Sequence, residues 1–296
     1  MPSARARATG AIFVGLMAVS WSAIWIRFCE ADAIVIAAGR TLVATLVLLP
    51  FFWPKRRSLT ALDRSDLLAI LLAGVSLAIH FAAWNAAVQN TTLVNAALLI
   101  NIHPIFLLAC ERLWMGLRPS RRRLFGTGVA LAGAAAIAVA SRDSGRHGLA
   151  GDLWAILGAL TFASYLLLGR RARSRLPLVS QVTVIYGVAS LTLIAVALLS
   201  GSVLLGLPPA TYGYVVLLGL VPTLAGHSAW NYAARHITPS IVAVCALGEP
   251  LGAGLLAFWI LGERVGLPVI GSGAVLLVGL LLTILPEPPA SRVAGA

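Results

Sequence analysis

The sequence predicts an all-α integral membrane protein with ten transmembrane helices, and two observations lead to that fold class. Of its 296 residues, 59% are hydrophobic and only 11% are charged, whereas soluble domains carry about 25% charged residues. Apolar runs of about 20 residues, long enough to cross a bilayer, follow one another with short polar breaks. No stretch is long enough to form a separate soluble domain.

The ten expected spans follow these apolar runs in chain order. Only Gln89-Asn90-Thr91 separates the third span from the fourth, so these two should form a tight helical hairpin. The connections at 54–65 and 170–177 are polar and basic. The expected spans are residues 9–27, 34–53, 66–87, 92–115, 124–140, 151–169, 178–200, 211–232, 238–261 and 266–285.

The net charge of +12 is explained by orientation in a lipid bilayer, so we expect no nucleic-acid partner. Cytoplasmic loops of membrane proteins collect Lys and Arg. With the N-terminus inside and the spans alternating, seventeen basic residues fall inside and four outside, and Arg40 lies within a span. This split predicts cytoplasmic termini and an even number of spans. Lys55 is the only lysine among 22 basic residues, which suggests a high-GC bacterial genome and hence the bacterial inner membrane.

A cleaved signal peptide is the alternative interpretation of the first span. Its basic start, its apolar run and the small-residue site Ala31-Asp32-Ala33 are typical of such a segment. Cleavage would leave nine spans and destroy the internal repeat described next, so we favour a span that is retained.

Two stretches of the chain match each other at a constant offset of 146 residues. This fixed register disfavours the alternative of chance similarity among Ala-, Leu- and Gly-rich helices. Five helices per half is an odd number, so the second half enters the membrane from the opposite side, as in the inverted repeats of many secondary transporters. We expect repeats at 1–140 and 151–286 and a cytoplasmic tail at 287–296. The matched positions are Trp84-Asn85 with Trp230-Asn231, Pro104 with Pro250, Gly116 with Gly262, Arg118 with Arg264 and Gly133 with Gly279.

Three segments resemble the EamA-type branch of the drug/metabolite transporter superfamily. They are AVSWSAIWIRF in the first span, IAAGRTLVATLVLLP in the second and GEPLGAGLLAFWILGERVGLPVIGSGAVLLVG in the last two. Two positions depart from the family pattern: Ser22 stands where Gly is usual, and Leu117 stands where Glu is usual. The resemblance covers nearly the whole chain. It implies a ten-helix transporter, usually an exporter of amino acids, related metabolites or toxic compounds.

An acidic residue and a histidine occupy matching positions near the middle of the membrane. Glu249 lies about half-way along the ninth span, where a charge costs roughly 2.5–3.5 kcal/mol, so it should face a cavity or a partner. Pro250 follows it and lacks an N–H, which can kink the helix. At the same offset, His103 precedes Pro104. We expect a substrate or proton site here, with protons as the candidate coupling ion. The alternative is a pair of kinks with satisfied polar groups.

Arg40 and two histidines are further candidates. Arg40 can bind an anionic group, pair with Glu249 as a gating ion pair, or reach outward to the interface; we favour the ion pair. His80 and His227 each lie just before Trp-Asn, and a histidine can change protonation near neutral pH or make a helix–helix hydrogen bond. Other candidates for the pathway, which could equally be interface or helix contacts, are Trp21, Trp84, Asn85, Tyr165, Tyr186, Trp230 and Asn231.

The sequence favours transport over catalysis. A Walker A loop needs Gly-Lys followed by Ser or Thr, but Lys55 lies in Pro54-Lys55-Arg56. We find no His-Glu-x-x-His, no Gly-x-Ser-x-Gly and no acidic or cysteine spacing for a metal, so we expect no cofactor and no enzyme. The predicted function is secondary-active or facilitated export of small metabolites such as amino acids, by a monomer or homodimer. An integral-membrane enzyme and a channel-like subunit are the alternatives.

Overall fold

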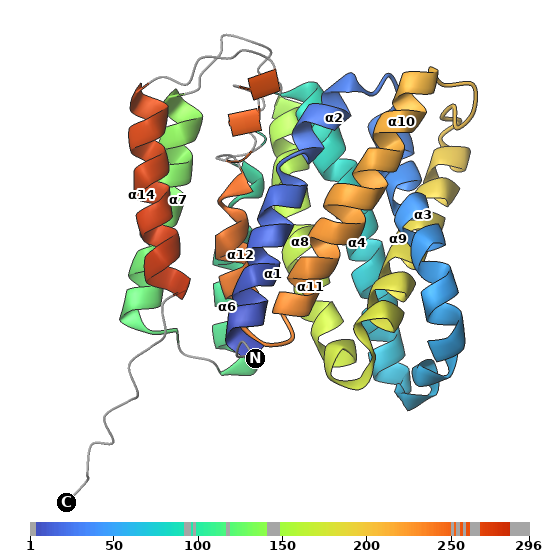
Figure 1. The fold of residues 1–296 in the computed structure, drawn as a ribbon, viewed down its shortest axis with the longest axis horizontal. Helices are drawn as coiled ribbons and strands as arrows, with labels where there is room; N and C mark the ends of the chain where they lie inside the picture. Colours follow the sequence, from blue (N-terminus) through green and yellow to red (C-terminus); the bar gives the residue numbers. More distant parts are fainter. Residues whose placement is uncertain are drawn as a thin grey trace, which may run out of the picture.

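The computed structural model is a bundle of helices that run roughly along one common direction (Figure 1). All regular secondary structure in the part of the chain that it describes is helical. That part comprises residues 4–91, 96, 99–116, 119–140, 149–249, 252, 255–256, 259–260 and 267–284.

The described helices fall into two groups along the chain. The first group is α1 (Ala4–Val19), α2 (Ser22–Phe28), α3 (Ala33–Phe52), the 3-10 helix η1 (Trp53–Ala61), α4 (Arg64–Asn90), α6 (His103–Met115) and α7 (Arg121–Ala140). The second group is α8 (Leu149–Arg175), α9 (Leu178–Leu199), α10 (Pro209–Leu218), the π-helix η2 (Gly219–His227), α11 (Ser228–Ala233), α12 (Pro239–Ala246) and α14 (Leu267–Ile284).

The helices have the length and the apolar exterior of a multi-pass membrane protein. Large apolar side chains point outward, with Leu191 70% exposed and Leu281 61% exposed, which suits contact with lipid. Within the described residues, six helical segments are long and apolar enough to cross a membrane, fewer than the ten spans expected. They are Ala6–Phe28, Ala33–Ala61, Arg64–Asn90, Leu149–Arg175, Leu178–Leu199 and Pro209–Ala233.

Several boundaries differ from those that hydropathy suggests. The first span is divided at Ser20, whose hydroxyl donates to the Leu16 carbonyl 2.8 Å away between α1 and α2. The expected loop at 54–65 is largely the 3-10 helix η1, which begins with Pro54 in its first turn. The basic connection at 170–177 is mostly helical, because α8 continues to Arg175. Hydropathy locates apolar runs but does not register these local bonds.

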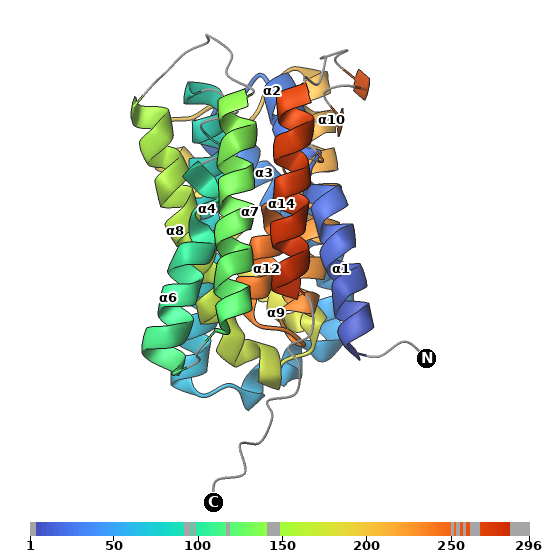
Figure 2. The ribbon, with the colours of Figure 1, turned by 90° about the vertical axis from the view of Figure 1, so that its left-hand side faces the viewer.

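The helices pack in pairs drawn from the two groups. α4 lies against α8, α3 against α9, α6 against α12 and α7 against α14, and the α7–α14 pair forms one edge of the bundle (Figures 1 and 2). At that edge the backbones approach closely, since a Cβ at Gly133 would lie 2.7 Å from Leu276 Cα. The pairs enclose a centre in which many polar side chains are buried, and the candidate site lies there.

Candidate functional site

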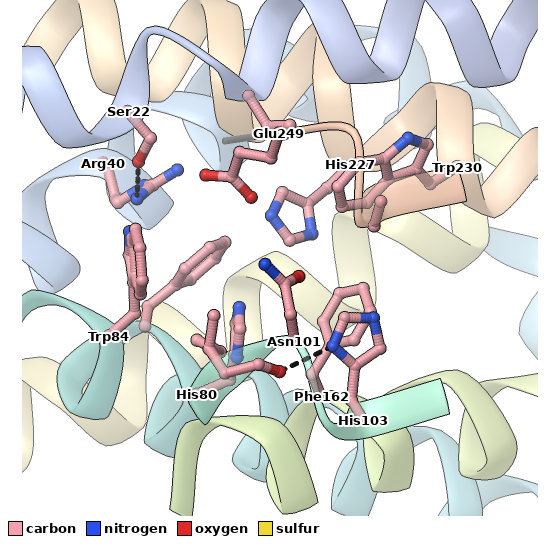
Figure 3. Close-up of a pocket in the computed structure, with 14 residues that line it drawn as sticks. Ser22, Arg40, His80, Trp84, Asn101, His103, Phe162, His227, Trp230 and Glu249 are labelled. Carbon is pink, nitrogen blue, oxygen red and sulfur yellow. Dashed lines mark hydrogen bonds between the residues drawn. The ribbon is translucent and has the colours of Figure 1, made fainter. Parts of the chain in front are cut away.

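A cavity in the centre of the bundle brings together seven of the residues that the sequence singled out (Figure 3). Both groups of helices contribute to it. The seven residues are Arg40, His80, Trp84, His103, His227, Trp230 and Glu249. Residues more than 200 positions apart in the sequence therefore meet in one place.

Arg40 is held by three different elements. Its side chain is only 1% exposed. Its Nε donates to Thr223 Oγ1 at 2.8 Å and its Nη1 donates to Ser22 Oγ at 3.2 Å. The guanidinium carbon lies 4.1 Å from the centroid of the Phe81 ring, which favours the cation further. The charge is therefore fixed in place at the wall of the cavity.

Glu249 presents the opposite charge. Its carboxyl group points into the cavity on the same side as the Arg40 guanidinium (Figure 3). Among the described residues, no cation lies within 4.0 Å of that carboxylate. The favoured ion pair is therefore not closed in this conformation. An unclosed pair of opposite charges that lines a cavity can receive a ligand that carries both charges.

Both helices that carry the matched ionisable residues are interrupted at the cavity. In the first half, a turn at Asn101–Ile102 precedes α6, which starts at His103. In the second half, a turn at Leu247–Gly248 follows α12 and precedes Glu249. The two interruptions lie at the same offset of 146 residues. Interrupted helices expose backbone polar groups near the middle of a membrane, where transporters bind substrates and ions.

His103 joins the two halves at this interruption. Its Nδ1 lies 2.7 Å from the Ile100 carbonyl oxygen, and its Nε2 lies 3.2 Å from the Ala243 carbonyl oxygen of α12. Carbonyl oxygens only accept hydrogen bonds, and a neutral imidazole has a single N–H. A neutral His103 therefore makes one of these two bonds at a time, and only the imidazolium makes both.

His80 and His227 lie side by side in an aromatic wall. Their ring centroids are 6.1 Å apart. His80 Nδ1 is 2.9 Å from the Gly158 carbonyl oxygen, whereas the buried Nδ1 of His227 has no hydrogen-bond partner among the described residues. Phe81 packs edge-on against His227 at 4.8 Å, and Phe162 lies 4.8 Å from His103. This wall combines apolar surface with an unused polar nitrogen.

Five predicted residues lie outside the cavity lining. Asn85 donates to the Ala33 carbonyl. Asn231 donates to the Tyr165 hydroxyl and to the His227 carbonyl. Tyr186 donates to the Thr223 carbonyl at 3.2 Å, and Trp21 stacks on Trp25 at 5.1 Å. These side chains support the site or join helices.

The remaining predicted residues are two tryptophans and two prolines at matching positions of the two halves. Trp84 and Trp230, both candidates for the pathway, line the same central cavity. Pro104 is the second residue of α6, so it starts that helix instead of bending it. Pro250 lies outside the described residues.

Sequence analysis missed several residues of the site. Asn101 and Phe162 line the cavity, and Thr223 and Ser22 hold Arg40. Asn101 had a visible signal, since it is a lone amide in an apolar run two residues before His103. Phe162 had none, because aromatic residues are common in membrane helices.

The cavity is narrow in this conformation. The volume available to the centres of water molecules is about 40 Å³, which holds roughly three waters. Most amino acids are larger than three waters, so the helices around the cavity must separate before one of these could enter. In this conformation the cavity is therefore too small for most amino acids.

Comparisons with known proteins agree with this architecture. An "uncharacterized transporter" of Archaeoglobus fulgidus is 24% identical over 272 residues, which cover 92% of this chain and 94% of that protein. A "probable terminal-alkyne amino-acid exporter" of Streptantibioticus cattleyicolor is 27% identical over 200 residues. That match spans 64% of this chain and 63%, less than two thirds, of the exporter. One crystal structure superposes with a TM-score of 0.77 over 93% of this chain and 96% of the other, at 15% identity, and so shares the fold.

The family assignment rests on both halves of the chain. The EamA-like transporter family matches residues 8–139 and again residues 149–285, so the two matches together cover most of the sequence. The resemblance seen in the sequence is thereby confirmed, and it points to transport and away from catalysis. The protein is a multi-pass membrane protein that belongs to the EamA-like transporter family.

Proposed function

We propose that the protein is a secondary-active or facilitated transporter that exports amino acids or related small metabolites. It would act by alternating access across the bacterial cytoplasmic membrane, with both termini in the cytoplasm. One observation carries the proposal: Arg40 and Glu249, from different halves of the chain, face the same central cavity without closing an ion pair. A zwitterionic amino acid offers a carboxylate to Arg40 and an ammonium group to Glu249. The printed name of the Streptantibioticus cattleyicolor relative supports the same substrate class.

Alternating access would use two inverted repeats of five helices each. Matching contacts in the two halves support this arrangement. A Cβ at Gly74 would lie 2.6 Å from Val188 Cβ, and a Cβ at Gly219 would lie 2.6 Å from Val43 Cβ. Gly219 lies 145 positions after Gly74, and Val43 lies 145 positions before Val188, so the second contact repeats the first with the two halves exchanged. The third helix of one half thus meets the second helix of the other, in both directions.

The helix pairs support the same two-fold relation. α4 packs against α8, and α1 packs against η2 and α11, so the third helix of each half meets the first helix of the other. The pairs α3–α9, α6–α12 and α7–α14 each join equivalent helices. α1 begins and α14 ends at the same end of the bundle (Figures 1 and 2), which agrees with an even number of crossings and with a ten-helix plan.

Counterflow in proteoliposomes tests the proposal. The full chain is reconstituted with a mixture of unlabelled proteinogenic L-amino acids inside, and the same mixture, radiolabelled, is added outside. A carrier takes up label faster when the inside is loaded, because its loaded site returns faster than its empty site. Uptake that does not depend on the internal amino acids indicates a channel, and the absence of uptake rejects amino acids as substrates.

Variants of the charged pair connect transport to the site. Glu249→Gln and Arg40→Gln should insert and fold but lose most of the transport. His103→Ala should be milder, because a neutral histidine leaves no buried charge uncompensated. Glu30→Gln is the matched control, since Glu30 is exposed and outside the cavity. If Glu249→Gln transports at the wild-type rate with unchanged pH dependence, Glu249 is a structural residue and the site assignment fails.

A further inference from the structure

The third helix of the second half contains one more residue than the third helix of the first half. Gly74 and Gly219 make matching contacts and are 145 positions apart. Trp84 and Trp230, further along the same two helices, are 146 positions apart and line the same cavity. One extra residue therefore lies between Gly219 and Trp230. The π-helix η2 (Gly219–His227) occupies this interval, and a π turn is the form in which a helix accommodates an extra residue.

Two adjacent residues explain why the helix widens at this point. Pro222 has no N–H and cannot bond to the Leu218 carbonyl four residues earlier. The Thr223 hydroxyl also donates to that carbonyl, at 2.8 Å. The bond spans five residues, which is the spacing of a π-helix. Pro222 therefore favours the wide turn because it lacks the N–H of the ordinary α-helical bond, and the Thr223 hydroxyl adds a side-chain bond to that turn.

The same hydroxyl receives the hydrogen bond from Arg40. Thr223 Oγ1 donates its only proton to Leu218, so toward Arg40 Nε, 2.8 Å away, it can only accept. The Tyr186 hydroxyl donates to the Thr223 carbonyl from α9. Thr223 is 0% exposed. The Arg40 guanidinium is therefore attached to the wide turn by a bond of fixed direction.

The equivalent interface, between α9 and α4, has neither the cation nor the wide turn. A Cβ at Gly219 would lie 3.0 Å from the Arg40 carbonyl oxygen, and a Cβ at Gly74 would lie 3.0 Å from the Ile185 carbonyl oxygen. The two contacts therefore correspond. Ile185 thus occupies the position equivalent to Arg40. The helix α4 runs without interruption from Arg64 to Asn90. The buried cation and the extra residue therefore meet at one of the two equivalent interfaces only.

We propose that the π-helical turn is a positioning device for Arg40, and that Thr223 is the residue that aims the guanidinium at the anionic group of the substrate. This inference rests on the proposed function, because Arg40 acts there as the anion-binding group. The π turn also carries His227 at its end, so the register of the turn sets the position of a second cavity residue. The extra residue is thereby explained by recognition and not by helix packing.

Three variants test the role of the hydroxyl. Thr223→Val keeps the shape but removes the acceptor, and Thr223→Ser keeps the acceptor. Thr192→Val on α9 is the matched control, because among the described residues the Thr192 hydroxyl bonds to the Val188 carbonyl of its own helix and to no residue of another helix. In the counterflow assay, Thr223→Val should raise KM about 10- to 100-fold, the range for losing a hydrogen bond to a charged group. Vmax should change less than about twofold, and Thr223→Ser and Thr192→Val should stay within about threefold of wild type.

A second measurement needs no substrate. With ¹⁵N-labelled arginine in nanodiscs, the Nε resonance of Arg40 is the one missing from Arg40→Lys. It should shift in Thr223→Val and stay in place in Thr223→Ser and Thr192→Val. If Arg40→Gln abolishes transport while Thr223→Val leaves KM and the resonance unchanged, the inference is wrong and the proposed function stands. Equal impairment by Thr223→Val and Thr223→Ser also overturns the inference. If no amino acid is exchanged by wild type, the proposed function fails, and the resonance alone decides whether Thr223 positions Arg40.

Discussion

The two ends of the helix bundle are held together by different chemistry. At one end, here called the Arg-rich end, α4 and α7 begin and α8 ends. At the opposite end, the described residues show no ion pair within 4.0 Å. The helices are linked there by two amide-to-carbonyl bonds and by one bond from the Thr91 hydroxyl to the Asp152 carboxylate. The ion pairs of the Arg-rich end are Arg123–Glu111, Arg175–Asp63 and Arg175–Asp66.

A pair of equivalent links shows the difference most directly. At the Arg-rich end, Arg235 donates to the Leu176 carbonyl at 2.9 Å and to Gln181 Oε1 at 2.8 Å. At the opposite end, Gln89 donates to the Ala31 carbonyl at 3.0 Å. Gln89 and Arg235 are 146 positions apart, and Ala31 and Leu176 are 145 apart. The same link is thus made by the charged guanidinium of Arg235 at one end and by the neutral amide of Gln89 at the other.

Glu111 has no equivalent at the opposite end. It is 0% exposed and accepts from the backbone N–H of Ser240 at 2.9 Å and from its hydroxyl at 2.6 Å. Ser240 is in the first turn of α12, so Glu111 caps that helix from a neighbouring one. Arg123 lies 3.7 Å away. The positions matching Glu111 and Arg123 are Ala257 and Val269, which can form neither a cap nor an ion pair.

A scaffold with matching halves can therefore be joined at its two ends by bonds of unequal strength. Hydrogen bonds that involve a charge are roughly twice as strong as neutral ones. Separating the helices at the Arg-rich end therefore costs more than separating them at the opposite end. We expect the cavity to open more often toward the opposite end, and the following experiments are designed to remove that difference.

Glu111→Ala should have the largest effect. It leaves Arg123 without its buried carboxylate and uncaps α12. Breaking a buried ion pair from one side costs about 3–5 kcal/mol, and the free energy of unfolding should fall by that amount in a detergent-unfolding titration. Glu30→Ala at the exposed surface is the control and should change it by less than about 0.5 kcal/mol. If Glu111→Ala lowers the free energy of unfolding by less than about 1 kcal/mol, this carboxylate does not hold the Arg-rich end together.

Arg235→Gln should make the Arg-rich end resemble the opposite end. The change removes charge-assisted bonds worth about 1.5–3 kcal/mol, so local opening should increase by a factor of about 10 or more. A cysteine at Leu176, which is 3% exposed, reports this opening through its maleimide labelling rate in a background in which Cys110 and Cys245 are both replaced by Ala. Native Cys29 near the opposite end is the internal reference. Faster labelling of both cysteines would indicate global unfolding and not local opening.

Gln89→Ala tests the weaker link, the hydrogen bond from Gln89 to the Ala31 carbonyl at the opposite end. The lost bond is neutral and exposed, so it should contribute no more than about 0.5–1 kcal/mol. Labelling of Cys29 should then accelerate about two- to fivefold, with no change at a cysteine placed at Leu176. An effect as large as that of Arg235→Gln would contradict the difference between the two ends.

Much of the fold was accessible from the sequence because its physical causes are local. Apolar runs indicated the helices, and the match between Trp84-Asn85 and Trp230-Asn231 indicated two related halves. The cost of a charge in the membrane identified Arg40 and Glu249 as residues that need a cavity or a partner, and both line the cavity.

The remaining features depend on contacts between distant segments. Thr223 is unremarkable in the sequence, and only its distance to Arg40 gives it a role. Glu111 lies in an expected span, but its partner Ser240 is 129 positions away. Tyr165 was expected in the pathway, yet it bonds to Asn231, because the face that a helix turns to the centre depends on its neighbours. Such choices are made by packing and are invisible in a single span.

Asp63 provides the smallest expected effect and tests whether exposed charges help to hold the Arg-rich end together. It caps α4 by accepting from the backbone N–H of Asp66 at 2.9 Å. That bond, the Ser65 hydroxyl and the Arg175 charge lower the pKa of Asp63 to about 2. A lowered pKa means that the contribution to stability is present above the unfolded value of about 3.9 and is lost as the pH falls toward about 2. Plotted against pH, the midpoint temperatures of thermal unfolding of wild type and Asp63→Asn should therefore follow parallel curves between about pH 5 and pH 8, since Asn also caps helices. Below about pH 4, wild type should lose stability faster than the variant. Parallel curves down to pH 2 would show that this exposed carboxylate adds nothing to the Arg-rich end, and that its strength lies in the buried Glu111.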